Sequence, residues 1–120
     1  MRLRLSKEPG TMITIKIERN DNDEIISFSL DGHAGYDVEG KDIVCAAVSA
    51  VTNMTLIGLN EKLRLNLKVE KSDSGYVKVN LPENIPEEEM IVAQFLLESM
   101  VTEYLDIESG YGKYVLVKER

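Results

Sequence analysis

The sequence predicts a single α+β domain in which one largely antiparallel sheet carries two helices packed on it. Two observations lead to this prediction. Segments with strand-like patterns occur as two pairs and once more near the end of the chain, and a longer helical segment follows each pair. The order is therefore ββαββαβ. Because strands and helices do not alternate singly, we expect mainly antiparallel pairing.

The first strand pair lies near the start of this pattern. Met12–Arg19 ("MITIKIER") alternates apolar and polar residues, as a half-buried strand does. The run "NDND" is a turn, and Glu24–Leu30 ("EIISFSL") alternates again. The two segments therefore form a predicted hairpin.

The first helix is predicted from Asp42 to about Leu59. This segment is almost entirely apolar or small, which suits a helix that is covered on most of its surface. Asp42 is a good N-cap residue. Gly58 weakens or ends the helix, so its last turn stays open.

The second half repeats the order of elements. Leu63–Lys71 and Tyr76–Leu81 form a predicted hairpin around "SDSG". Pro86 begins the second predicted helix, and the three glutamates that follow it complement the positive end of the helix dipole. Tyr111–Lys118 ("YGKYVLVK") is the last predicted strand.

The length of the chain indicates one domain. A chain of 120 residues with 43% hydrophobic residues can bury one modest core. We expect residues 12–120 to form this domain. Residues 1–11 are basic, lack the apolar core of a signal peptide, and are expected to be a poorly ordered leader or tail.

Composition excludes several classes of function. The net charge of −7 argues against electrostatic binding to nucleic acid. No apolar run approaches the roughly 20 residues that a membrane span needs. One cysteine cannot form an internal disulfide or a multi-cysteine zinc site, and a lone thiol suits a reducing cytoplasm. We expect no metal and no cofactor.

The segment "DGHAGYDVEGKDIVCAAVSAV" holds the only histidine, His33, and the only cysteine, Cys45. With Asp42 as N-cap, Cys45 is the third helical residue, where the helix dipole favours a thiolate, which is the nucleophilic form of cysteine. His33 lies twelve residues upstream, across a glycine-bearing loop. Such a loop can bring a base and a nucleophile within hydrogen-bond reach.

Other interpretations of these residues stay open at this point. A lone cysteine in an apolar helix is usually a small buried hydrophobe. Asp42 either caps the helix or orients His33, and Ser49 either lines a site or bonds back to its own helix. A phosphate-binding loop is disfavoured, because the segment lacks the Lys and Ser/Thr spacing of such loops and carries acidic residues.

The segment resembles the signature of the ribosomal-processing cysteine protease family, called Prp. The likeness rests on a Gly-His pair, a glycine in the short loop, an Asp-Ile-Val-Cys-Ala-Ala run and a serine one turn on: Gly32, His33, Gly35, Asp42, Ile43, Val44, Cys45, Ala46, Ala47 and Ser49. Outside this segment the likeness is one of element order, from about Met12 to the C-terminus.

The resemblance implies a function and a role for each residue. Members of the family are bacterial cytoplasmic homodimers that remove an N-terminal extension from large-subunit ribosomal protein twenty-seven. By resemblance, Cys45 is the nucleophile and His33 the general base. Gly32 is the hinge of a mobile loop, and Asp42 and Ser49 line the site. The competing hypothesis is a non-catalytic, dimeric, ribosome-associated binding module in which Cys45 is structural.

Overall fold

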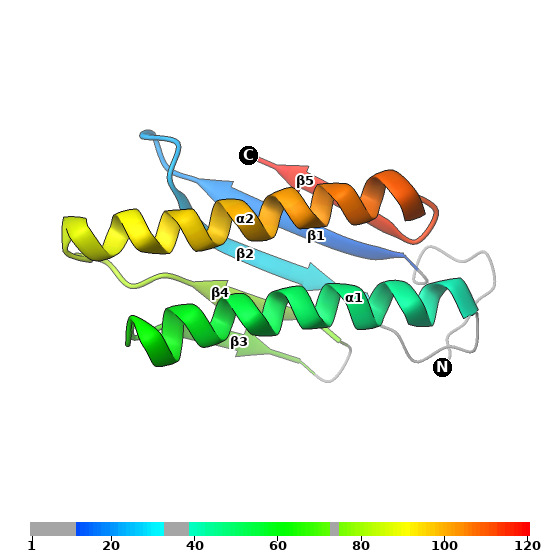
Figure 1. The fold of residues 1–120 in the computed structure, drawn as a ribbon, viewed down its shortest axis with the longest axis horizontal. Coiled ribbons are helices and arrows are strands. Elements are labelled where there is room, and N and C mark those ends of the chain that lie inside the picture. Colours follow the sequence, from blue (N-terminus) through cyan, green and yellow to red (C-terminus); the bar gives the residue numbers. More distant parts are fainter. Residues whose placement is uncertain (1–11, 33–38, 73–74) are drawn as a thin grey trace.

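The computed structural model describes residues 12–32, 39–72 and 75–120, with side chains from residue 43 onward in the second range. Its elements follow the order expected from the sequence. Five strands form one sheet, and two long helices lie side by side on one face of it (Figure 1). The predicted α+β class and element order are confirmed.

The sheet has the strand order β3-β4-β2-β1-β5 and is largely antiparallel. Strands β1 (Ile13–Arg19), β2 (Ile25–Asp31), β4 (Val77–Asn80) and β3 (Lys68–Lys71) pair antiparallel with their neighbours. The last strand, β5 (Val115–Glu119), pairs parallel with β1. It can do so because the second helix carries the chain from β4 past β2 and β1 to the far edge of the sheet.

The helices are α1 (Glu39–Leu56), which continues as the π-helical segment η2 (Ile57–Lys62), and α2 (Glu87–Tyr111). They run antiparallel to each other across the sheet (Figure 1). Gly58 stands at their contact, since a Cβ atom there would lie 2.8 Å from Leu96 Cδ1. This close approach gives a physical reason for the glycine. The α-helix ends two residues earlier, at Leu56, and the chain continues through Gly58 as the π-helical η2.

The core lies between the helices and the sheet. In β1 every second residue (Ile13, Ile15 and Ile17) is buried, as the alternating sequence pattern predicts. The same face of β2 contributes Phe28, which pairs with Ile17 across the strands. The helices contribute the other side of this core, with Val44, Cys45, Val48 and Leu59 from α1 and η2, and Ala93, Leu97, Met100, Val101, Tyr104 and Ile107 from α2.

One buried hydrogen-bond network fixes α1 against α2. The Thr52 hydroxyl donates to the Val48 carbonyl oxygen at 2.7 Å, and it also shares a short hydrogen bond with the Tyr104 hydroxyl. Both side chains are buried. Because a buried hydroxyl without a partner is costly, this network sets the rotation and the lengthwise position of α1.

Three predicted element boundaries were wrong. The first helix begins at Glu39 and not at Asp42. The predicted strand from Leu63 shortens to Lys68–Lys71. Arg64 adopts a positive φ of 58°, which lies outside the β region. The second helix extends to Tyr111, a residue predicted to begin the last strand.

Segment Ile43–Lys62 of α1 and η2 is long and apolar enough to cross a membrane, with a mean hydropathy of 1.6 over its most apolar stretch. The sequence reading missed this because Ser, Thr and Asn interrupt the run. A core helix passes the same test; 33% of this stretch is buried, and its buried residues belong to the core between helices and sheet.

Candidate active site

Gly32 directly follows β2 and has a backbone conformation that other residues rarely adopt. Its φ is +96°, in the region that favours glycine. A Cβ atom at this position would lie closer than 3.0 Å to the Met12 carbonyl oxygen and 3.2 Å from the Met12 carbonyl carbon. Gly32 is therefore held against the start of β1, and it sets the direction in which the chain leaves β2 toward His33.

His33 itself lies outside the described residues, as does the loop that follows it. The described chain resumes with α1, whose start lies at the same end of the molecule as the end of β2 (Figure 1). Residues 33–38 therefore connect Gly32, after β2, to the first turn of α1.

Asp42 is not the N-cap of α1, contrary to the sequence-based interpretation. The helix begins three residues earlier, at Glu39, which makes Asp42 the fourth helical residue. Glu39, Gly40 and Lys41 were assigned to the loop because two glycines and several charged residues precede the apolar run. A helix can still form through them, since the tertiary packing of its apolar face stabilises the segment as a whole.

Cys45 is consequently the seventh residue of α1 and not the third. At 1.5 Å per residue, its backbone lies roughly 9 Å beyond the start of the helix. The dipole effect falls off within the first turn. The helix terminus therefore stabilises a Cys45 thiolate less than the sequence position had suggested, and a nearby positive charge becomes more important for activation.

Cys45 lies at the edge of the core. It is 9% exposed, the highest value among the buried apolar residues of the described structure, and its neighbours Ile43 and Ala46 are exposed. The side chain is thus packed in the core on one side and close to the surface on the other. This position combines features of a structural cysteine and of a nucleophile that a peptide could reach.

Ser49 is exposed and lies four residues after Cys45 on α1. Two other hydroxyls of this helix bond back to backbone carbonyls, Thr52 to Val48 and Thr55 to Val51. Within the described part of the chain, the Ser49 hydroxyl forms no such bond, so it is available to a ligand on the surface. Of the expected site residues, the structure thus brings Cys45 and Ser49 onto one stretch of α1.

Several described residues other than Cys45 take part in ion pairs or have shifted pKa values. Arg19 forms ion pairs with Glu98 at 2.6 Å and with Glu119 at 3.0 Å. The hydrogen bond from Arg19 holds the pKa of Glu98 below its usual value, and these carboxylates raise the pKa of Arg19. Burial raises the pKa of Tyr104 to about 12. The contacts of Arg19 and of Tyr104 both hold α2 in place.

Among the described residues, no group of three or more acidic, His or Cys side chains could hold a metal ion.

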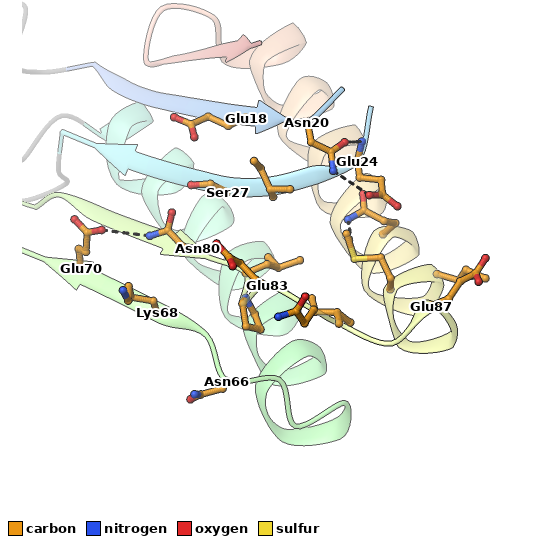
Figure 2. Close-up of a pocket in the computed structure, with 18 residues that line it drawn as sticks. Glu18, Asn20, Glu24, Ser27, Asn66, Lys68, Glu70, Asn80, Glu83 and Glu87 are labelled. Atoms are coloured by element: carbon orange, nitrogen blue, oxygen red, sulfur yellow. Dashed lines mark hydrogen bonds between the residues drawn. The ribbon is translucent and has the colours of Figure 1, made fainter. Parts of the chain in front are cut away.

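A large groove is found at the other end of the sheet, and it contains none of the predicted site residues. Its volume is about 1390 Å³, and strands β1 to β4 and the start of α2 line it (Figure 2). Sequence reasoning missed this groove, although the runs "NDND" and "PENIPEEE" at strand and helix ends were a signal for a polar, acidic surface there.

Solved structures of similar fold define the class of protein. An essential ribosomal processing protease Prp from S. aureus, solved with a substrate peptide, has a TM-score of 0.78 at 24% identity, over 91% of this chain and 100% of the other. The same S. aureus protease with a covalently linked product peptide has a TM-score of 0.76 at 26% identity, with the same coverage. Together with a cysteine at the surface edge of α1, this similarity defines a small α+β cysteine protease.

The particular family follows from the sequence comparisons. A family model described as Cysteine protease Prp matches residues 12–116. The ribosomal processing cysteine protease Prp of Bacillus subtilis (strain 168) is 33% identical over 106 residues, which is 83% of this chain and 90% of that protein. The chain therefore belongs to the Prp family of cysteine proteases, which confirms the resemblance drawn from the segment around Cys45.

Proposed function

We propose that this protein is a ribosomal processing endopeptidase that removes the N-terminal extension of large-subunit ribosomal protein twenty-seven. The single observation that carries the proposal is family membership, with a B. subtilis relative named for ribosomal processing at 33% identity. The position of Cys45 at the edge of the core is compatible with it, because a fully buried nucleophile would be closed to a peptide.

The proposed chemistry uses Cys45 as nucleophile and His33 as general base. His33 takes the thiol proton, and the sulfur forms a bond to the scissile carbonyl carbon. The resulting imidazolium gives its proton to the leaving amine as the peptide C–N bond breaks, which leaves a thioester on Cys45. Water then hydrolyses the thioester, with His33 again accepting a proton, and the free thiol is restored.

The place of Cys45 in the helix strengthens the case for a histidine partner. Because Cys45 lies beyond the first turn of α1, the helix dipole alone gives little activation. An imidazolium supplies the missing positive charge. The free backbone N–H groups of the first turn, before Cys45, are the proposed donors to the oxyanion.

Gly32, Asp42 and Ser49 have supporting roles in this proposal. Gly32 is the hinge at which the His33 loop leaves β2, and its close approach to Met12 fixes one side of that hinge. Asp42 orients His33 or the substrate, since the start of α1 at Glu39 removes the capping role. Ser49 lines the site from the exposed side of α1.

The cleavage assay uses the purified chain and the extended ribosomal protein, with the shortened product measured by mass. Cys45→Ala abolishes cleavage while the fold persists, at a stability cost of about 1 kcal/mol. His33→Ala abolishes cleavage as well. Asp42→Asn keeps the denaturant midpoint and loses turnover. An Asn variant with unchanged turnover would restrict the site to His33 and Cys45.

Thiol reactivity separates the protease from a non-catalytic binding module. Iodoacetamide should modify Cys45 of the folded protein near neutral pH, and His33→Ala should slow this reaction most at neutral pH. Alkylation that proceeds only as fast as unfolding would favour the binding module, in which Cys45 is a structural core residue. Identical pH profiles for the two proteins would mean that His33 does not interact with Cys45.

We also propose that the protein is a homodimer that acts in the bacterial cytoplasm. A lone thiol suits a reducing compartment, and the net charge of −7 disfavours direct contact with nucleic acid. Exposed apolar side chains flank the Gly58–Leu96 helix contact, among them Phe95, which is 74% exposed. The others are Met54, Ile57 and Val92.

Phe95→Glu tests the homodimer. A charge placed at the centre of an apolar interface should dissociate it, because the charge would be buried without a partner. Light scattering should give the dimer mass for the wild type and the monomer mass for the variant. Glu103→Lys, elsewhere on α2, is the control for a change of charge. A wild type of monomer mass at high protein concentration would refute the homodimer.

A further inference from the structure

We propose that the groove at the far end of the sheet is a docking site for a basic segment of a polypeptide, separate from the site at Cys45. The groove is formed where β1 ends, β2 begins, β4 ends and α2 begins (Figure 2). Cys45 lies in the second turn of α1, and α1 starts at the opposite end of the molecule from the start of α2 (Figure 1). From Ile26 in the groove to Asp31 at the end of β2 the chain covers roughly 17 Å at the usual rise of a strand.

The groove is strongly acidic. Five carboxylates line it (Glu18, Glu24, Glu70, Glu83 and Glu87) against one ammonium group, that of Lys68. Within the described part of the chain, Glu83 and Glu87 form no ion pair. Clustered like charges that are not neutralised internally favour an oppositely charged ligand and speed its approach.

The groove also offers the contacts that a peptide needs. Apolar side chains lie among the carboxylates, and two of them, Ile26 and Ile91, are exposed. The side-chain amides of Asn66 and Asn84 supply donors and acceptors at its wall. The mixture of acids, amides and isolated apolar surface suits lysine or arginine residues, whose long stems pack on apolar surface while the charged heads bind acceptors.

A single buried hydroxyl marks a subsite in this groove. Ser27 is 3% exposed, lines the groove, and its Oγ has no hydrogen-bond partner among the described residues. Its register partners are Glu18 on β1 and Asn80 on β4, so the three side chains stand side by side on one face of the sheet. Buried hydroxyls are nearly always hydrogen-bonded, which makes the Ser27 Oγ an exception that a ligand would satisfy.

This subsite matches a lysine side chain. An ammonium group has three N–H donors and no acceptor. The Glu18 carboxylate, the Ser27 hydroxyl and the Asn80 carbonyl oxygen are three acceptors on adjacent strands, and the Asn80 amide nitrogen is already used as a donor to Glu70 at 3.3 Å. Glu18 already pairs with the chain's own Lys78, whose Nζ lies 3.8 Å from the carboxylate, so Glu18 would share its charge between Lys78 and the bound lysine.

The identity of the docked segment rests on the proposed function. Ribosomal proteins bind RNA phosphates and therefore carry lysine- and arginine-rich segments. The groove would hold such a segment of the substrate while the cleaved bond lies at Cys45, so that full-length substrate binds more tightly than a short peptide. Two linked contacts raise the effective concentration of the cleavage site at Cys45.

The test compares two triple variants of equal charge. The groove variant is Glu70→Gln with Glu83→Gln and Glu87→Gln. The control variant is Glu61→Gln with Glu88→Gln and Glu103→Gln; these residues are exposed and lie outside the groove. Glu88 shares the first turn of α2 with Glu87, so the control reproduces the change at the helix dipole.

Binding is measured without cleavage, on Cys45→Ala chains, by anisotropy of a labelled peptide of alternating lysine and alanine. Neutralising three exposed carboxylates should weaken binding about tenfold, at a factor of about two for each ion pair. The control variant should change it less than twofold. Ser27→Ala should weaken binding, whereas Ser29→Ala, a buried serine of the same strand outside the groove, should not.

Cleavage is measured on chains that retain Cys45, with the full-length precursor and with a short peptide that spans the cleaved bond. The groove variant should raise KM for the precursor about tenfold and leave the short peptide unchanged. Equal effects of the two triple variants, or no effect on the lysine peptide, would overturn the docking groove. If the wild type cleaves neither substrate, the proposed function fails, and the binding measurement still decides on the groove.

Discussion

Gly32→Ala perturbs the one point where the described structure fixes the path of the chain toward His33. The native φ of +96° is open to glycine and strained for alanine, at about 1–2 kcal/mol. The new Cβ would also approach the Met12 carbonyl oxygen more closely than the 3.0 Å that real Cβ atoms keep. Moving Met12 is costly because the next residue, Ile13, donates its N–H to the Tyr114 carbonyl oxygen at 2.9 Å and begins β1.

The two effects together predict a substantial loss of stability. Relief of a tight contact by a backbone shift costs typically 1–3 kcal/mol, so the sum is about 3 kcal/mol. For a domain of this size that lowers Tm by roughly 10 °C. Turnover should fall further than stability, because the shift changes the direction in which the chain continues to His33. Thermal unfolding and the cleavage rate, measured at a temperature where both proteins are folded, separate these effects.

Two variants make the reasoning refutable. Gly110→Ala is the matched control, since nothing lies within 4 Å of a Cβ there and the residue is helical. It should raise stability by about 0.5–1 kcal/mol. Gly32→Asn tolerates a positive φ better than alanine but keeps the contact with Met12, so it should not rescue stability. A Gly32→Ala protein within 0.5 kcal/mol of wild type, or full rescue by Asn, would contradict the close contact.

The remaining predictions concern the packing of the helices. Thr52→Val should lower the free energy of unfolding by about 1–3 kcal/mol, because it leaves the buried Tyr104 hydroxyl unpaired. Tyr104→Phe should lower it by about 1 kcal/mol, because Thr52 stays bonded to the Val48 carbonyl oxygen. Equal denaturant midpoints for the two variants would contradict this hydrogen-bond network. The pKa of Tyr104 is raised from 10.0 to about 12, so its contribution to stability is complete below pH 10 and is lost as pH rises toward 12; Tyr104→Phe should reduce that alkaline loss. Arg19 lowers the pKa of Glu98 from 4.5, so the stabilising contribution of Glu98 is present above pH 4.5 and is lost as pH falls below it. Glu98→Gln should therefore make the denaturant midpoint less sensitive to acid. An unchanged dependence of the midpoint on acid pH would contradict the ion pair.

Much of the fold could be predicted from local patterns. The alternation in β1 identified that strand because one face of it is buried and the other is not. The alternating sequence also identified β2, although Ser27 and Ser29 on its second face are buried as well. The parallel partner of β1 could not be read in this way, since β5 is placed by the length and path of α2 and not by its own sequence. The start of α1 was missed for a similar reason, because glycines and charges hide a helical turn that tertiary packing stabilises.

The candidate site was predicted mainly from a short motif. The motif from Gly32 to Ser49 pointed to a cysteine protease by its resemblance to the Prp family, before any packing was known, and the family comparison confirmed that class. The motif did not indicate that Cys45 lies in the second turn of α1 and at the edge of the core, because both facts depend on where the helix begins and what covers it. The acidic runs at strand and helix ends indicated an acidic surface, but not the groove itself, since its lining residues come together only when four strands and the start of α2 meet.

The most direct test of the central claim is to trap the covalent intermediate on Cys45. The protein and the extended ribosomal substrate are mixed, quenched with acid within one turnover, and measured by intact mass and peptide mapping. Because the chain has one cysteine, a thioester can form at a single residue. The proposed mechanism predicts a species heavier by the N-terminal extension less one water, mapped to Cys45 and absent from Cys45→Ala. Substrate cleavage at the wild-type rate by Cys45→Ala, or an adduct on any other residue, would contradict it.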